Sequence, residues 1–396
     1  MSVATALLRE PATIRARCDA LLALGEADRL PGFAVHPERL EVAASVTVET
    51  IRSTYPDLRI PYHARWRHFA AGGRDRWGEL AATLPAHAVI PARLDLCVVS
   101  VLLDAGAGPA WRYRDQTTGQ TLARSEGLAV ASLDAFRAGL FSSDPGHPLQ
   151  ADAGGLARLD AATLARAFQA SAENPLDGLE GRADLLRRLA ARLRAVRPGA
   201  APRVAGLFDT IQAAALSADS IFATVLDGLG PIWPGRLCLD GENLGDVWPH
   251  PLAAPAGPAP GLVPFHKLSQ WLTYSLIEVF EDAGVPVTGL DALTGLPEYR
   301  NGGLFLDTGV LRLRDPSLAG EVLPVGHAVI VEWRALTVAL LDRVAAQVRA
   351  RLGVSAEEMP LARVLEGGTW AAGRRLAQRL REGAPPLRVA SDGTVF

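Results

Sequence analysis

The stretch VEWRALTVALLDRVAAQVRARLG, residues 331–353, decides the fold class. Its large apolar side chains recur at intervals of three and four residues, which is the spacing of one face of an α-helix. Gly353 follows the last of them and is a typical residue to end a helix. The pattern predicts a long helix that buries one face in the core. The residues of that face are Trp333, Leu336, Leu340, Val344 and Val348.

Helical patterns also dominate the rest of the chain. They begin at Pro11, which suits a first helical turn, and recur over residues 181–196 and 265–284. Strand signals are few. Residues 111–125 alternate on both sides of Gln116-Thr117-Thr118-Gly119, which predicts a β-hairpin. The apolar run 94–104 fits a buried helix or a buried strand equally well.

These patterns predict one mainly α-helical domain over residues 1–396 with a small β-hairpin. Residues 1–90 form its N-terminal helical portion and residues 91–396 its catalytic core. A lid or linker is expected at residues 248–264, where repeated prolines exclude a regular helix and a central strand.

Bulk composition narrows the classes of function. With 49% hydrophobic residues, the 396-residue chain is typical of a globular protein, and its net charge of -3 argues against the broad basic surface that nucleic-acid binding requires. The three cysteines are isolated, and the N-terminus does not resemble a signal peptide. His63 and His68 lie five residues apart without an acidic partner, which is weak support for a metal site. We expect a cytoplasmic protein without membrane, nucleic acid, metal or cofactor; the oligomeric state is open.

Lys267 is the single lysine in a chain that contains 40 lysines and arginines in total. It precedes an apolar stripe that starts at Leu268, so it falls in the first turn of a helix, where the helix dipole disfavours a cation. An arginine is larger, planar and permanently charged, and cannot replace a compact ammonium group at a reacting centre. The position therefore suggests a functional lysine, although chance survival of one lysine is the alternative.

Two carboxylates stand in unusual surroundings. Glu298 lies in TGLPEYRNGG, residues 294–303, between a proline and an expected Asn-Gly-Gly turn, and turns often present functional groups. Glu332 comes at the expected start of the long helix, where the helix dipole favours an anion. The structural alternatives are an ion pair of Glu298 with Arg300 and a simple helix-end charge for Glu332, with Arg334 as a salt-bridge partner.

These segments resemble the uracil catabolism protein four family. The residues that carry the resemblance are LPEYRNGGLFLDTGVL, starting at Leu296, and VEWRALTVALLDR, starting at Val331. A more distant similarity is to the queuosine salvage protein, an N-ribosyl hydrolase with a helical fold related to DNA glycosylases. Its motifs are matched here by FHKLSQ, by the triplet Glu298-Tyr299-Arg300 and by Glu332-Trp333-Arg334.

The resemblance implies a DNA-glycosylase-like helical fold and the hydrolysis of an N-glycosidic bond in a small, ribosylated uracil-breakdown product such as a ribosylurea, with or without a 5′-phosphate. Glu298, which replaces the aspartate of the salvage protein, and Lys267 are the expected catalytic residues. Glu332 is expected to hold Lys267 or Arg334, and Asp95, in ARLDLCVV, to accept hydrogen bonds from a urea-like amide. The expected substrate-binding residues are Asp95, Phe265, His266, Tyr299, Arg300, Glu332, Trp333 and Arg334.

Two other classes of function remain open at this point. The first is a non-catalytic module that binds a nucleotide or a partner on a glycosylase-like helical fold. The second is a nucleic-acid glycosylase, for which the arginine-rich segment 184–203 is the candidate surface. The net negative charge disfavours the second class.

Overall fold

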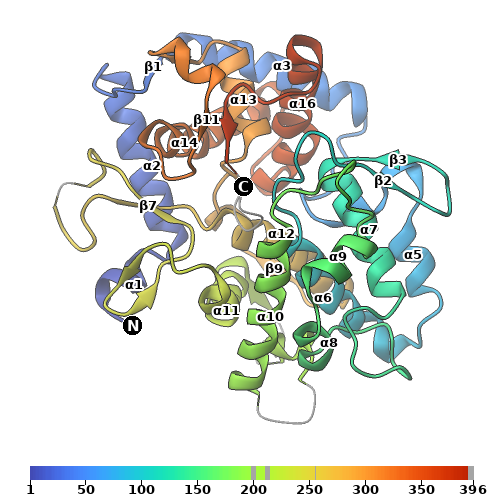
Figure 1. Cartoon of the computed structure of the whole chain (residues 1–396). Helices are drawn as coiled ribbons and strands as arrows, with labels where there is room; N and C mark the ends of the chain where they lie inside the picture. Colours follow the sequence, from blue (N-terminus) through green and yellow to red (C-terminus); the bar gives the residue numbers. More distant parts are fainter. Residues whose placement is uncertain (198–201, 210–214, 255, 391–396) are drawn as a thin grey trace. The chain divides into compact units, whose positions relative to one another are not determined.

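The computed structural model describes residues 1–197, 202–209, 215–254 and 256–390, and these are mainly helical, as predicted (Figure 1). They form two compact units, each assembled from separated segments. Unit 1 contains residues 1–63, 235–270 and 289–390, and unit 2 contains residues 64–234 and 271–288. The first boundary between the units thus follows His63, and none falls at residue 90. The DNA-glycosylase-like topology stays a prediction.

Unit 1 contains the long helix that the sequence predicts over residues 331–353. It also contains the short strand pairs β1–β10, β7–β8 and β5–β6, which are antiparallel, and the parallel pair β11–β12. Its elements are α1 (Val3–Leu7), α2 (Pro11–Glu26), β1 (Phe33–Val35), η1 (Pro37–Arg39), α3 (Leu40–Thr54), β5 (Cys238–Leu239), β6 (Glu242–Asn243), β7 (Val247–Pro249), β8 (Leu262–Pro264), η5 (Leu290–Ala292), α13 (Tyr299–Asp307), β10 (Leu311–Leu313), η6 (Pro316–Gly320), β11 (Val322–Leu323), α14 (Ala328–Leu352), α15 (Leu361–Val364), the π-helical turn η7 (Leu365–Thr369), α16 (Trp370–Arg381) and β12 (Arg388–Val389). Helix α12 (Lys267–Asp282) begins in unit 1, and its residues from Trp271 onward belong to unit 2.

Helix α14 forms the centre of unit 1. It packs against α2, α3 and α13, and all five residues of the predicted stripe are buried. Its first half is buried on every side, from Ile330 to Leu341, so it is a core helix there and amphipathic only further along. Gly353 ends the helix with a φ of 71°, in agreement with the predicted cap.

The proline-rich segment 248–264 is attached to unit 1 rather than free. Its two ends pair as the antiparallel strands β7 and β8, with Trp248 opposite Val263. Arg17 of α2 donates a hydrogen bond to the carbonyl oxygen of Pro258, and the buried His250 contacts the side chain of Glu332 in α14. These contacts hold the segment against two core helices.

Unit 2 contains the helices that the middle part of the chain forms. The run 94–104, for which helix and strand fitted equally well, belongs almost entirely to helix α6. The elements of unit 2 besides α12 are α4 (Trp66–Phe69), η2 (Ala71–Gly73), α5 (Arg76–Ala81), α6 (Ala86–Leu102), β2 (Tyr113–Arg114), β3 (Thr121–Leu122), α7 (Arg124–Arg137), α8 (Ala153–Ala157), α9 (Ala161–Ala167), α10 (Leu179–Val196), η3 (Val204–Phe208), β4 (Leu216–Ser217), α11 (Ala218–Leu229), η4 (Gly230–Ile232) and β9 (Val287–Thr288).

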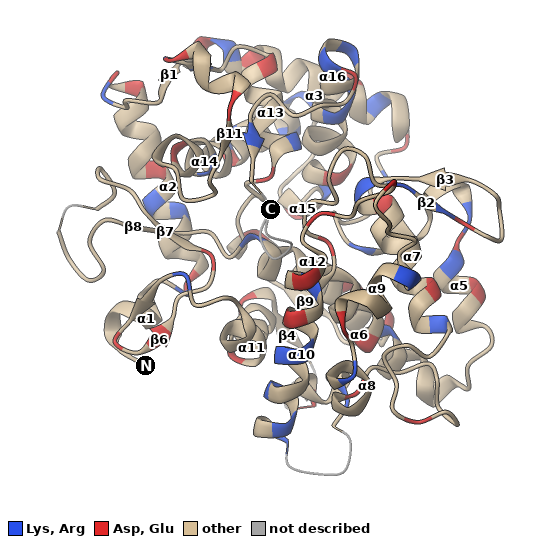
Figure 2. Ribbon diagram, in the orientation of Figure 1, with Lys and Arg blue, Asp and Glu red and all other residues tan. Residues whose placement is uncertain are grey.

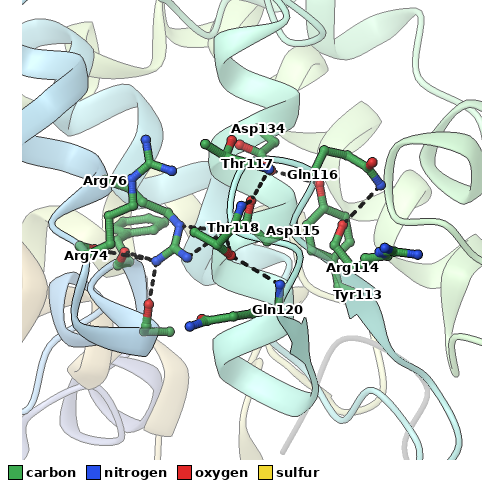
Figure 3. Close-up of polar contacts among 12 residues, drawn as sticks. Arg74, Arg76, Tyr113, Arg114, Asp115, Gln116, Thr117, Thr118, Gln120 and Asp134 are labelled. Atoms are coloured by element: carbon green, nitrogen blue, oxygen red, sulfur yellow. Dashed lines mark hydrogen bonds and ion pairs between the residues drawn. The ribbon is translucent and has the colours of Figure 1, made fainter.

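The predicted β-hairpin is present in unit 2 (Figure 3). Strands β2 and β3 pair antiparallel, with Tyr113 opposite Leu122. Asp115 organises the turn because its carboxylate accepts hydrogen bonds from the main-chain N–H of Thr117 and from the hydroxyl group of Thr118. The buried Arg76 of α5 forms an ion pair with the same carboxylate, at 2.6 Å from Oδ2. Burial opposes ionisation of Asp115, but these hydrogen bonds outweigh it and lower its pKa to about 2.

The arginine-rich segment 184–203 lies partly on α10, whose basic residues are seen in Figure 2. Residues 198–201 of that segment lie outside the described residues. On the helix, Arg187 forms ion pairs with Glu180 and Asp184, and Arg192 donates hydrogen bonds to the carbonyl oxygens of Asp227 and Gly228. The guanidinium groups of Arg187 and Arg192 therefore form intramolecular contacts within unit 2. In the described part of the chain no helix is both long and apolar enough to span a membrane.

Candidate active site

Lys267 and Glu298 lie next to each other in unit 1. The ammonium nitrogen Nζ of Lys267 is 3.7 Å from the carboxylate oxygen Oε2 of Glu298, and the two side chains are 11% and 13% exposed. Lys267 is the first residue of α12, and Glu298 is the residue immediately before α13. Two residues that are 31 positions apart in the chain therefore form a largely buried ion pair at the starts of two helices.

The side chain of Glu298 does not cap the backbone of its own helix. Glu298 is the N-cap residue of α13, but its carboxylate makes no capping hydrogen bond to the helix. Instead, Oε1 accepts a hydrogen bond from Nδ2 of Asn301, at 3.2 Å. Asn301 is itself held by the carbonyl oxygen of Leu296 and by the hydroxyl group of Thr369. The buried amide thus fixes the direction in which the carboxylate points.

The expected Asn-Gly-Gly turn is wrong, because Asn301, Gly302 and Gly303 lie inside helix α13. The physical reason is close packing. A Cβ atom on Gly302 would lie 2.7 Å from the indole of Trp333 in α14. Gly302 is therefore needed where two helices approach each other, and not for a left-handed backbone conformation.

His63 is a site residue that the sequence did not identify. Its ring nitrogen Nε2 lies 3.3 Å from Oε1 of Glu298, and its Nδ1 lies 2.7 Å from Oε2 of Glu366 in the turn η7. The imidazole is 2% exposed. Burial opposes protonation, but the hydrogen bonds to Glu298 and Glu366 outweigh it and raise the pKa of His63 to about 9. His63 is thus a buried cation between two carboxylates.

The two cations determine the ionisation of Glu298. Burial of the carboxyl group favours its neutral form, but the hydrogen bond from His63 and the positive charge of Lys267 outweigh that effect. As a result the pKa of Glu298 is lowered. Glu298 is a carboxylate at neutral pH.

Asp246 and Arg334 position the start of α12. Asp246 Oδ2 accepts a hydrogen bond from the main-chain N–H of Lys267 at 3.0 Å, and its carboxylate receives a bidentate pair from Arg334 at 2.7 and 2.8 Å. The guanidinium of Arg334 also lies 4.1 Å above the ring centroid of Phe265. Burial opposes ionisation of Asp246, but Arg334 outweighs it and holds the pKa of Asp246 well below its usual range. A buried ion pair and a stacked aromatic ring therefore hold the backbone that carries Lys267.

The predicted binding residues His266, Tyr299 and Arg300 also lie in unit 1, and their side chains contact other residues of the protein. Nε2 of His266 lies 3.0 Å from the carbonyl oxygen of Leu8, and its pKa is lowered chiefly by burial. Arg300 donates a hydrogen bond to the carbonyl oxygen of Gly383, and its guanidinium lies over the ring of Tyr299. Their proposed contacts with a substrate stay predictions, as does that of Trp333.

Glu332 does not hold Lys267 or Arg334 as expected. It is the fifth residue of α14, fully buried, and its Oε2 accepts a hydrogen bond from the main-chain N–H of Gly32. Its Oε1 lies 3.1 Å from Nε2 of His250. Both oxygens are therefore engaged in holding two surrounding loops of unit 1. Arg334 is a salt-bridge partner, as in the structural alternative, but its partner is Asp246.

Asp95 belongs to unit 2 and is fully buried in helix α6. Its carboxylate forms an ion pair with Arg203, at 2.6 Å, and accepts hydrogen bonds from the main-chain N–H groups of Ala151 and Ala205. Burial is the strongest influence and raises the pKa of Asp95 to about 6. These contacts tie three segments of unit 2 together, and a role of Asp95 in binding an amide stays a prediction.

The residues that the sequence missed share one property: their partners are remote in the chain. His63 stood out only as a histidine near His68 without an acidic neighbour, yet its two acidic partners are Glu298 and Glu366. Asp246 and Glu366 are surrounded by ordinary loop and helix residues and carried no local signal. Within the described residues, no group of three His, Cys, Asp or Glu side chains is arranged to hold a metal ion.

Comparisons with known proteins cover nearly the whole chain. The model of the family described as Protein of unknown function (DUF1688) matches residues 7–396. The chain belongs to this family. Among its relatives, Protein urg3 of Schizosaccharomyces pombe is 41% identical over 396 residues, covering 97% of this chain and 96% of that protein. Uracil catabolism protein 4 of Lachancea kluyveri is 36% identical over 378 residues, covering 85% of both proteins.

These relatives confirm the resemblance to the uracil catabolism protein four family. The more distant similarity to the queuosine salvage protein stays a prediction.

Proposed function

We propose that this protein functions in uracil catabolism as a hydrolase of N-glycosidic bonds, acting on a small N-riboside such as a ribosylurea. One relative is named Uracil catabolism protein 4, which supports the pathway. The observation that carries the chemistry is the buried ion pair between Lys267 and Glu298, in which a carboxylate that stays ionised at neutral pH lies next to an ammonium group.

Breaking the N-glycosidic bond creates positive charge on the sugar and negative charge on the leaving nitrogen. As the bond between C1′ and nitrogen breaks, its electron pair moves to the nitrogen, and the sugar becomes a cation that resembles an oxocarbenium ion. An ionised Glu298 beside C1′ stabilises that positive charge. The leaving nitrogen takes up a proton, and Lys267 is the donor. Water then adds to C1′ and loses a proton, so that riboside and water give the free sugar and the free amide.

The test is to incubate the full-length protein with ribosylurea, with and without a 5′-phosphate, and to measure the released urea and sugar. Glu298→Gln keeps the shape of the side chain and removes its charge. Because such groups contribute about 100-fold or more, we expect turnover to fall by at least about 100-fold. Binding of the riboside, measured by calorimetry, is expected to change little.

Glu321→Gln serves as the matched control, because Glu321 is an exposed carboxylate outside the cluster. It is expected to retain wild-type turnover. If the wild-type protein binds the ribosides and releases no sugar, the protein is a binding module. If Glu298→Gln keeps more than about a tenth of the activity, Glu298 does not have the proposed role.

A further inference from the structure

His63 is fixed in place from several directions. Its main-chain N–H donates a hydrogen bond to the carbonyl oxygen of Ala362, and its ring lies 5.7 Å from that of Trp370. The ring of its neighbour Tyr62 lies below the guanidinium of Arg363. With 2% exposure, the imidazole of His63 has almost no surface that a substrate can reach. Its contribution must therefore pass through the groups that it touches.

Both ring nitrogens of His63 face carboxylates. A neutral imidazole has one N–H donor and one acceptor nitrogen, so one of its nitrogens would face a carboxylate oxygen without a hydrogen. The doubly protonated ring donates to both. The distances of 2.7 Å to Glu366 and 3.3 Å to Glu298 thus favour the imidazolium form on geometry alone. The shorter contact indicates that Glu366 is the stronger anchor.

Charges alternate along this cluster, in the order Lys267, Glu298, His63 and Glu366. Glu298 therefore has a cation on each side, while Glu366, within the part of the chain that the structure describes, forms an ion pair with His63 alone. The other charge near Glu298 is that of Arg300, which also favours ionisation of the carboxyl group. The arrangement suits a carboxylate that must remain negative and is a weak base.

We propose that His63 is a positioning residue, held by Glu366 as an imidazolium, that fixes Glu298 as an ionised carboxylate which stabilises the sugar cation. The claim that Glu298 stabilises a sugar cation rests on the proposed function. The claim that Glu366 holds His63 as an imidazolium beside Glu298 does not. Glu366 acts only through His63.

The proton balance of the reaction agrees with a weakly basic Glu298. Removing a proton from water before it attacks requires a base with a pKa near the working pH, and Glu298 is not such a base. Once water has bonded to the cationic C1′, its oxygen is positively charged and strongly acidic. At that stage a weakly basic carboxylate can accept the proton. Glu298 therefore stabilises the cation first and takes the proton last, and transfer of that proton to Lys267, whose nitrogen lies 3.7 Å away, restores the ammonium group that protonated the leaving nitrogen.

The first measurement is an NMR titration of the full-length protein labelled in its histidines, with His63 identified by the signal that His63→Gln lacks. We expect His63 to titrate near pH 9, well above an unperturbed histidine, whose pKa is about 6.5. Glu366→Gln should lower that midpoint by about one unit or more. Glu38→Gln, which removes an exposed carboxylate beside His36, should leave it unchanged.

The second measurement is the pH profile of kcat/KM on the acid side, where Glu298 becomes protonated. We expect His63→Gln to move this limb upward by about one pH unit or more, since a cation beside Glu298 is lost. A side chain that serves only for packing would lower activity at every pH and leave the limb in place, and that result overturns the proposal.

Different results would contradict the hydrolase activity and the positioning role of His63. A wild-type His63 that titrates below about pH 7 overturns the positioning role, and this result needs neither a variant nor a substrate. Absence of sugar release with a His63 that titrates near pH 9 overturns the hydrolase and leaves the charge assignment intact.

Discussion

At the scale of single residues, the surroundings of Lys267 suit a compact ammonium group better than a guanidinium group. Its backbone is fixed by Asp246, and its ammonium group fits beside Glu298 with little exposure. An arginine would bring a planar group with five donors into the same space and would bind the carboxylate through two hydrogen bonds. Such a pair would keep Glu298 away from the sugar.

We therefore expect Lys267→Arg to be inactive although it preserves the charge. An arginine does not release a proton, so turnover should fall by about 100-fold. The control is the reverse exchange Arg59→Lys at an exposed position, which should leave turnover unchanged. The measurement is release of urea from ribosylurea. Wild-type turnover by Lys267→Arg would show that the lysine has no special role.

Asp246 and Arg334 have a structural role beside Lys267, and contact of Arg334 with a substrate stays a prediction. Both are held in a buried bidentate ion pair, and Arg334 is stacked on Phe265. Breaking such a pair leaves an uncompensated charge in the interior, which generally costs 3–5 kcal/mol. The pair therefore fixes the start of α12, and thereby Lys267, to the central helix α14.

At the scale of elements, the close approach of α13 to α14 places Glu298. Two adjacent glycines of α13 have different surroundings. A Cβ atom on Gly302 would meet the Trp333 ring at 2.7 Å and the hydroxyl of Thr337 at 2.8 Å, whereas one on Gly303 would meet only Pro386, at 3.5 Å or more. The first glycine is thus required by packing, and the second is not.

Replacing these glycines gives a matched pair of variants. Gly302→Ala should destabilise the protein by about 1–3 kcal/mol, because it overpacks a helix contact in the core. Gly303→Ala should be neutral or stabilising by up to about 1 kcal/mol, since alanine has the better helix propensity. Urea unfolding followed by circular dichroism measures both. Equal effects of the two substitutions would contradict the packing role of Gly302.

The elements themselves were largely predictable. The helices from Pro11, over 181–196, from Lys267 and over 331–353 all appear, because periodic burial is a local signal. The resemblance indicated Lys267 and Glu298 as catalytic residues, but the ion pair between them is seen only in the structure. In contrast, the Asn-Gly-Gly residues were mistaken for a turn, because the contact that requires Gly302 comes from α14. Local sequence does not record which remote surface a glycine faces.

At the scale of the whole molecule, the cluster depends on chain segments that only folding brings together. His63 ends the first segment of unit 1, Lys267 lies in the second, and Glu298 and Glu366 lie in the third. No spacing rule could have found the contacts of His63, since its partners are more than 200 residues away. The charges of the cluster are buried only in the folded state, so they also connect the stability of the protein to pH.

The stabilisation by His63 should therefore disappear in alkaline solution. Its pKa is about 9 in the folded protein and about 6.5 in an unfolded chain. A raised pKa stabilises the fold fully below the unfolded value, and that contribution is lost as the pH rises through the folded value. The contribution is on the order of 3 kcal/mol, because one pKa unit corresponds to about 1.4 kcal/mol.

The measurement is the free energy of unfolding of the wild-type protein and of His63→Gln between pH 6 and pH 10. Groups that titrate equally in both proteins cancel in the difference, so the difference isolates His63 and the carboxylates that it contacts. We expect it to be largest near pH 6 and to decline steadily until it levels off above about pH 9. A difference that is constant over this range would mean that the pKa of His63 is the same in the folded and the unfolded protein. In that case Glu298 and Glu366 would not hold His63 as a cation at neutral pH, and the proposed positioning role of His63 would be contradicted.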